Sequence, residues 1–213
     1  MKTDDLVKLL ATGVQPVAAG VTRRRLLQGL AASLPVSVLI LLTVFGVRPD
    51  LAQATHLAMF WVKLALPVFM ALAGLHAVLA LARPGRRAPA TLPLVAAALA
   101  MIWLLAAQAL AGATPEERLP LLLGMSWSQC PFNITLLSAP MLIAGLWVMR
   151  GLAPTRPALA GAATGLFAAG TGTMVYVMHC PEMAAPFLAT WYVIGMAIPV
   201  VAGALLGPRL LRW

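Results

Sequence analysis

Residues 57–82 read LAMFWVKLALPVFMALAGLHAVLALA, a stretch in which only Lys63 and His76 carry or can acquire a charge. About 20 consecutive apolar residues are enough for a helix to cross the hydrocarbon core of a bilayer. A run of this length is too long for an ordinary core helix, and it lacks the strict alternation of a strand in a membrane barrel. The stretch therefore predicts a membrane-spanning helix.

The rest of the chain repeats this pattern. Hydrophobic residues make up 62% of the sequence and charged residues 10%, whereas a typical soluble domain is ~25% charged. The runs long enough to span a bilayer are Leu26–Val47, Leu57–Ala82, Thr91–Ala113, Pro131–Met149, Ala158–Met178 and Met183–Leu206. We therefore expect an all-α integral membrane bundle of six transmembrane helices, residues 23–213, preceded by an N-terminal segment, residues 1–22.

The cations are distributed unequally between the two ends of the expected bundle. Of the 15 lysines and arginines, only Arg48 and Arg118 lie in the connections of one end, and Lys63 lies inside the second span. The other cations all fall at the end that holds both termini: Lys2, Lys8, Arg23, Arg24, Arg25, Arg83, Arg86, Arg87, Arg150, Arg156, Arg209 and Arg212. By the positive-inside rule both termini are cytoplasmic. The net charge of +9 then reflects topology and contact with the lipid bilayer, and we expect no nucleic-acid partner.

The only two cysteines, Cys130 and Cys180, each precede a proline at one end of an apolar run. Both fall on the outer side of the expected topology, where thiols can pair. A disulfide between them would stabilise the fold by about 4 kcal/mol in the chain-entropy model, so a structural bridge and a reactive sensing pair both remain open. Neither cysteine belongs to a Cys-x-x-Cys pair, and Cys130, Cys180 and His179 are only weak candidates for a metal site.

Polar residues inside the expected spans are few. Lys63 lies about two turns from the outer end of its span, which favours a side chain that extends to the membrane surface over a role in transport. No aspartate or glutamate falls inside any span, so the usual ion-coupling group of a carrier is missing. We expect neither an enzyme nor a cofactor.

The N-terminal segment is the only sizeable stretch free to meet a cytoplasmic partner. It predicts a short amphipathic helix in which the acidic first turn favours the positive helix terminus. The candidate contact residues are Asp4, Asp5, Leu6, Leu9 and Leu10. Such a helix either lies on the membrane surface or binds a partner protein.

Several motifs together resemble a known family. They are Met1-Lys2-Thr3-Asp4-Asp5-Leu6, Leu159-Ala160-Gly161 with Gly165-Leu166, Tyr176-x-x-His179-Cys180-Pro181-Glu182, Phe187, Trp191-Tyr192, and the ending Gly203-Ala204-Leu205-Leu206-Gly207-Pro208-Arg209-Leu210-Leu211-Arg212-Trp213. In this combination the sequence resembles the NrsF family, the negative regulators of sigma F, from end to end.

The resemblance implies a multi-pass anti-sigma factor of the bacterial inner membrane. Such a protein holds an extracytoplasmic-function sigma factor of RNA polymerase inactive until an envelope stress, such as a heavy metal or an oxidant, is perceived. It implies that Cys130 and Cys180 are the sensing pair, with His179 and Glu182 as auxiliary candidates, and that the segment around Asp4, Asp5 and Leu6 helps to bind the sigma factor. The alternative from another class is a membrane thiol-disulfide oxidoreductase or a small metal-handling transporter.

The cation distribution generates a test of topology. Fusions of a reporter enzyme that is active only in the periplasm should be active after Ala54, Glu117 and Glu182, and inactive at the C-terminus. The reason is that short loops rich in lysine and arginine are retained in the cytoplasm. An active C-terminal fusion would reverse the proposed orientation.

Overall fold

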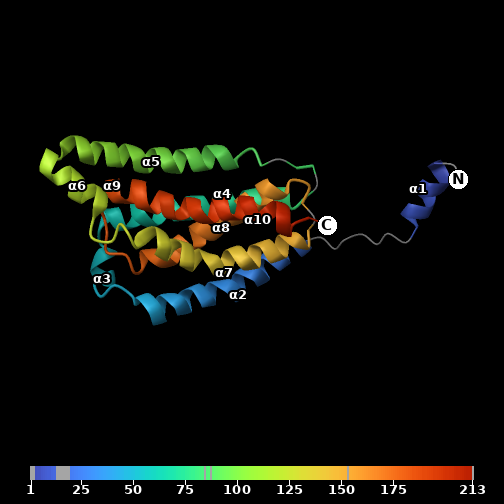
Figure 1. Cartoon of the computed structure of the whole chain (residues 1–213), viewed down its shortest axis with the longest axis horizontal. Coiled ribbons are helices and arrows are strands. Elements are labelled where there is room, and N and C mark those ends of the chain that lie inside the picture. Colours follow the sequence, from blue (N-terminus) through green and yellow to red (C-terminus); the bar gives the residue numbers. More distant parts are fainter. Residues whose placement is uncertain (1–2, 13–19, 84, 87, 153, 213) are drawn as a thin grey trace.

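The structure is a computed structural model that describes residues 3–12, 20–83, 85–86, 88–152 and 154–212. The described residues form helices and their connections and contain no strand. Figure 1 shows the long helices side by side in one bundle, with the short N-terminal helix α1 (Thr3–Ala11) apart from it.

The remaining helices follow in chain order. They are α2 (Val21–Ile40) with the π-helical turn η1 (Leu41–Phe45), α3 (Leu51–Ala54), α4 (Ala58–Leu81), α5 (Thr91–Gly112), α6 (Pro115–Leu123), α7 (Cys130–Arg150), α8 (Pro157–Val177), α9 (Ala185–Phe187), the π-helical turn η2 (Leu188–Tyr192) and α10 (Val193–Leu210). Within the described residues, six of these helical stretches are long and apolar enough to cross a membrane. The expected all-helical architecture with six spans is therefore confirmed.

The observed helices match the predicted runs closely, and the largest differences lie at the two ends of the chain. Helix α2, which forms most of the first span, begins at Val21 and not at the predicted Leu26. Helix α10 continues to Leu210 instead of ending at Leu206. A Gly-Pro pair usually ends a helix. Here Gly207 faces α8 so closely that a Cβ atom would overlap the Pro157 carbonyl oxygen. The glycine therefore permits packing and does not terminate the helix.

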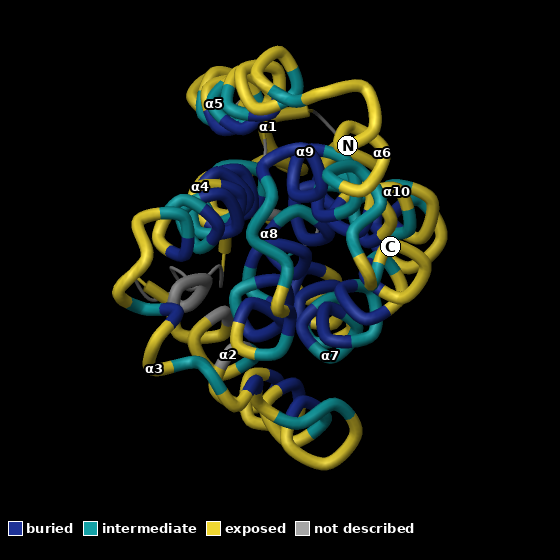
Figure 2. Tube along the Cα trace, turned by 90° about the vertical axis from the view of Figure 1, so that its left-hand side faces the viewer, coloured by how far each residue is buried: buried dark blue, intermediate teal, exposed yellow. Residues whose placement is uncertain are grey.

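Helix α8 forms the centre of the bundle and packs against α4, α7 and α10. In α8, 67% of the membrane-spanning stretch is buried, against 18% in the first span and 17% in α5. Figure 2 shows the same gradient, with α2 and α5 at opposite edges of the bundle and largely exposed. The elements at the periphery therefore face lipid over most of their surface.

Close contact between α8 and α10 depends on small residues. A Cβ atom at Gly161 would overlap the carbonyl oxygen of Gly203, and one at Gly165 would overlap that of Pro199. Without a hydrophobic driving force between helices in lipid, such close backbone approach is a principal source of association. The packing role that the Gly161-x-x-x-Gly165 and Gly203-x-x-x-Gly207 spacings indicate is confirmed.

The two ends of the bundle differ in the elements that they carry. The short helices α3, α6 and α9 lie at one end, while α2 begins and α10 ends at the other (Figure 1). At the first end α6 contains no buried residue. Its helix is started by a reciprocal cap in which the Thr114 backbone N–H donates to Glu117 Oε2 at 3.0 Å. This hydrogen bond lowers the pKa of the Glu117 carboxyl.

Which end of the bundle faces the cytoplasm stays a prediction, as does the division of the chain at residue 22.

Candidate functional site

The turn between α8 and α9 carries the His179-Cys180-Pro181-Glu182 motif at the end of the bundle that holds α3 and α6. The backbone N–H groups of His179 and Cys180 both donate to the Tyr176 carbonyl, at 2.9 Å and 3.1 Å, and so close the end of α8. Pro181 has no N–H and disfavours helical geometry in the residue before it, so the helix stops here. The carbonyl groups of Cys180 and Glu182 consequently have no helical partner and can accept hydrogen bonds from other elements.

Lys63 supplies those hydrogen bonds from α4. Its side chain is fully buried, and Nζ donates to the Cys180 carbonyl at 2.6 Å and to the Glu182 carbonyl at 2.8 Å. Nζ also lies 5.4 Å from the centre of the Tyr192 ring, which adds a cation–π contact. The prediction that Lys63 extends to the membrane surface is wrong, because its position on α4 places the ammonium against unpaired carbonyl groups inside the bundle.

Arg48, which follows the first span, is the second cation on this turn. Its Nη1 donates to the same Cys180 carbonyl at 3.1 Å, and its backbone N–H donates to the Met178 carbonyl at 3.0 Å. Nε and Nη2 form a bidentate pair with Asp50, with both distances 2.7 Å. This pairing raises the pKa of Arg48 and lowers that of the Asp50 carboxyl. The pair therefore persists at pH values below the usual range of an aspartate.

His179 and Glu182 attach the turn to two further segments. His179 Nδ1 lies 2.9 Å from the Gly46 carbonyl oxygen, and its ring lies 5.4 Å from that of Phe45. The Glu182 carboxylate accepts hydrogen bonds from the backbone N–H of Met125 at 2.7 Å and from the backbone N–H and hydroxyl of Ser126, both at 3.2 Å. Both auxiliary candidates thus fix the turn in place, one against the first span and one against the segment before α7.

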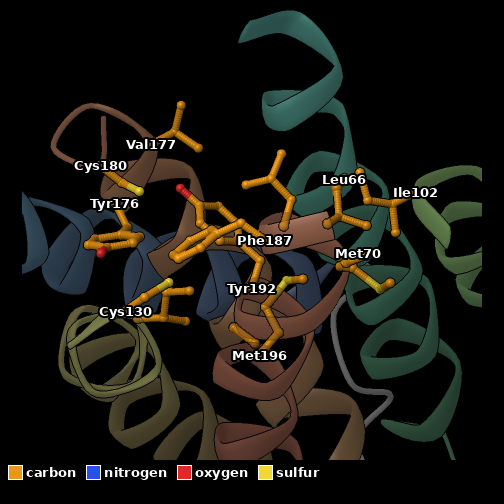
Figure 3. Packing of buried hydrophobic residues seen from close by; sticks show 14 of the residues in the cluster. Leu66, Met70, Ile102, Cys130, Tyr176, Val177, Cys180, Phe187, Tyr192 and Met196 are labelled. Carbon is orange, nitrogen blue, oxygen red and sulfur yellow. The ribbon is translucent and has the colours of Figure 1, made fainter. Parts of the chain in front are cut away.

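The structure brings Cys130 and Cys180 into one buried cluster. Both thiols are free and fully buried, and they share the cluster with Tyr176, Phe187 and Tyr192. Figure 3 shows the Tyr176 side chain between the two cysteines. Among the described residues, the Tyr192 hydroxyl has no hydrogen-bond partner despite its burial. The pair is therefore a packed dithiol whose sulfur atoms no solvent reaches in this conformation.

The backbone also connects Cys130 to the turn. The Cys130 N–H donates to the Ser126 carbonyl at 2.9 Å, and Ser126 in turn donates to Glu182. A displacement of either cysteine therefore affects the same hydrogen-bonded segment.

The weak metal candidates do not form a preformed site. No group of three or more histidine, cysteine, aspartate or glutamate side chains able to hold a metal ion occurs in the part of the chain that the structure describes. Cys130, Cys180 and His179 accordingly do not come together as a three-ligand set, because His179 is directed at the Gly46 carbonyl.

The candidates for partner binding lie on α1, away from this cluster (Figure 1). The helix begins with Asp4 and Asp5 in its first turn. Leu6 is 41% exposed and Leu9 68% exposed, while the side chain of Leu10 lies outside the described residues. The part of the apolar stripe that the structure describes is therefore exposed.

Sequence reasoning missed the roles of Arg48, Lys63 and Tyr192 in this site. A cation inside an apolar run is itself a signal of function or of a specific partner, and Lys63 carried that signal. Arg48 counted only toward topology, and Tyr192 only toward the family motif. Arg48 and Lys63 share the Cys180 carbonyl as acceptor, and the Tyr192 ring packs against the Lys63 ammonium. Neither kind of contact leaves a mark in the sequence.

Six apolar helices with α8 at their centre, two buried cysteines beside a turn that Lys63 and Arg48 hold at one end, and an amphipathic helix beyond the other end define a polytopic helical membrane protein with features at both ends. The family model described as "Negative regulator of sigma F" matches residues 10–213. The chain belongs to the NrsF family.

Two relatives match over their full length. The chain is 43% identical over 216 residues to the probable anti-sigma-F factor NrsF of Azospira oryzae and 41% identical over 220 residues to the anti-sigma-F factor NrsF of Caulobacter vibrioides. Each comparison covers 100% of both chains. No solved structure matches this chain. The family is defined by regulation of a sigma factor and not by a reaction, in keeping with the expectation of a non-enzyme.

The hydrogen bonds of Lys63 generate a prediction about stability. Replacing Lys63 by Met keeps the apolar stem but leaves the Cys180 and Glu182 carbonyls unpaired, at a cost of about 1–3 kcal/mol for each buried group. We expect a lower melting temperature in detergent and less protein in the membrane. Arg118→Met, which removes an exposed cation bonded to the Leu110 carbonyl at 3.2 Å, should change neither. Unchanged stability of Lys63→Met would show that the lysine is not needed to hold the turn.

Proposed function

We propose that this protein is an anti-sigma factor of the bacterial inner membrane that binds an extracytoplasmic-function sigma factor and releases it when an envelope stress alters Cys130 and Cys180. The observation that carries the proposal is that the chain is 43% and 41% identical, over the full length, to two proteins named as a probable anti-sigma-F factor and an anti-sigma-F factor. The distribution of cations supports an orientation in which α1 is cytoplasmic and the dithiol faces the periplasm.

Helix α1 has the properties of a partner-binding element. Its Leu6 and Leu9 are exposed, and an amphipathic helix with an exposed apolar stripe can bind in an apolar groove of another protein. Asp4 and Asp5 add negative charge that suits a basic surface, such as that of a protein that binds nucleic acid. Sequestration through α1 would compete with the contacts that a sigma factor makes elsewhere.

The dithiol has the properties of a switch because it has no room for a larger group. Protein interiors are close-packed, so a modification of either fully buried thiol requires the surrounding side chains to move. A divalent thiophilic cation would displace the two thiol protons and bind both sulfur atoms. A two-electron oxidant would take up the two protons and two electrons and leave a disulfide. In either case the distance between Cys130 and Cys180 changes, and with it the geometry of the turn.

The energy required for release is modest. A tenfold change in the affinity for the sigma factor corresponds to about 1.4 kcal/mol, and coupling of ~1–3 kcal/mol between two sites is ordinary. The loss of one or two charge-assisted hydrogen bonds at the turn is of this size.

The partner-binding role of α1 can be tested with Leu6→Ser and Leu9→Ser together. These substitutions remove exposed apolar contact area and should leave the bundle inserted, because neither residue packs against it. We expect the sigma factor to be lost from co-purification and its target genes to be transcribed without stress. Lys8→Ala on the same helix is the matched control. Full retention of the sigma factor by the double variant would assign binding to the cytoplasmic connections or the C-terminus.

The sensing role can be tested with Cys130→Ser and Cys180→Ser, alone and combined. Serine preserves the size of the side chain, so we expect normal abundance, normal repression and at least a tenfold loss of induction by a thiophilic metal ion or an oxidant. Met125→Leu is the control for a sulfur atom on the same face, since Met125 is 97% exposed. Reduced abundance of each single variant would indicate a structural role, and full inducibility of the double variant would exclude thiol sensing.

A further inference from the structure

We propose that Arg48 is the positioning residue that couples the dithiol to α1, and that the first span, α2 with η1, is the element that moves. This inference rests on the proposed function in that α1 is taken as the partner-binding helix. In the repressing state Arg48 holds the outer end of the first span on the 178–182 turn. In the released state that hold is lost, and α2 changes its position relative to α7.

The outer end of the first span is held by polar contacts to this turn. Arg48 contributes two of them, from Nη1 to the Cys180 carbonyl at 3.1 Å and from its backbone N–H to the Met178 carbonyl at 3.0 Å. His179 contributes a third, to the Gly46 carbonyl at 2.9 Å. The Arg48 side chain is 6% exposed, so water has little access to replace a lost acceptor unless the site opens. Whatever moves Cys180 therefore moves the anchor of the first span.

The remainder of α2 is held weakly. Toward α7, Ser37 Oγ donates to the Leu137 carbonyl at 2.8 Å and Ser33 Oγ lies 3.5 Å from Met141 Sδ. Gly29 faces the Val148 side chain with no room to spare, since a Cβ atom would come within 3.3 Å of it. Only 18% of the first span is buried, against 67% of α8, so the packing that resists a displacement of α2 is limited.

Open grooves flank α2 at its inner end, where the chain leads toward α1. One groove of about 690 Å³ lies on the α4 side, lined in part by Leu27, Leu75 and Phe167. Another of about 690 Å³ lies on the α7 side, lined in part by Gln28 and Trp147. These grooves leave space beside the inner half of α2 on both flanks, while Gly29 stays in close contact with Val148.

Among the side chains of this inner end that the structure describes, Arg25 bonds to the end of α7. Its Nη1 donates to the Gly151 carbonyl at 3.2 Å, in an exposed position. Water competes for an exposed bond of this kind, so it restrains α2 only weakly.

The π-helical turn η1 provides a place where the first span can change register. It occupies Leu41–Phe45, directly before the anchor, and the Gly46 N–H closes it on the Leu41 carbonyl at 2.7 Å. Isolated π-turns are frequent at functional sites. Conversion of a π-turn to α-helical geometry shifts the preceding helix by one residue, which corresponds to a rise of about 1.5 Å and a rotation of about 100°. When Arg48 is released, conversion of η1 to α-helical geometry would therefore shift and rotate α2 by a defined amount.

The test uses Arg48→Ala, with Arg118→Ala as the matched control on the same face. Amide hydrogen exchange of the purified full-length protein in lipid nanodiscs measures α2 directly. We expect residues 24–40 to exchange about tenfold faster in Arg48→Ala, with α8 unchanged, and we expect no difference in Arg118→Ala. This measurement needs no sigma factor, so it stands whether or not the proposed function holds. Unchanged exchange in residues 24–40 would overturn the inference.

Transcription of the sigma-factor target genes in cells tests the direction of coupling. Arg48→Ala should be derepressed without stress at normal abundance, as if permanently induced. Because Arg48 acts after the thiols, the triple variant with Cys130→Ser and Cys180→Ser should also be derepressed. Repression by the triple variant, or derepression only in proportion to a loss of protein, would overturn the inference.

Discussion

The ammonium group of Lys63 is the constraint on which the end of the bundle that carries α3, α6 and α9 depends. A buried cation without a partner costs several kcal/mol, and among the described residues no carboxylate pairs with this one. Two backbone carbonyls, those of Cys180 and Glu182, take the place of solvent. Because carbonyl groups belong to the chain itself, the cation fixes the path of the backbone and not merely a side chain. The turn after α8 is thereby fastened to α4.

That turn fixes the other elements in its neighbourhood. Arg48 and His179 join it to the end of the first span, and the Glu182 carboxylate joins it to the segment that leads into α7. These few consecutive residues thus connect α8 and the last span to the first span, to α4 and to the segment before α7, and one of them is a cysteine. A thiol at such a point has a larger effect on the arrangement of helices than its size suggests, because the surrounding groups have no alternative partners in lipid.

The sequence was sufficient to predict the six spans, but it was insufficient to predict the hydrogen bonds that hold the turn after α8. Six apolar runs of about 20 residues have few structural solutions in a bilayer, so runs such as residues 57–82 and 91–113 could be assigned within a residue or two. The two Gly-x-x-x-Gly spacings correctly indicated close helix packing. The cysteines could be placed on one face, but their complete burial depends on how α7, α8 and η2 pack together. Lys63 was misassigned because its acceptors are backbone carbonyls, which every residue possesses, and only the tertiary path of the turn shows which of them are free.

The burial of both thiols also has a kinetic consequence. A reagent reaches them only through a transient local opening, so its access depends on the equilibrium and the rate of that opening. At low reagent concentration the response rate follows the product of concentration and open fraction, whereas at high concentration it is limited by opening alone. The close packing around Tyr176 thus makes the response depend on how long the reagent is present. A pulse of reagent much shorter than the opening interval leaves most molecules unchanged, and sustained exposure converts them all.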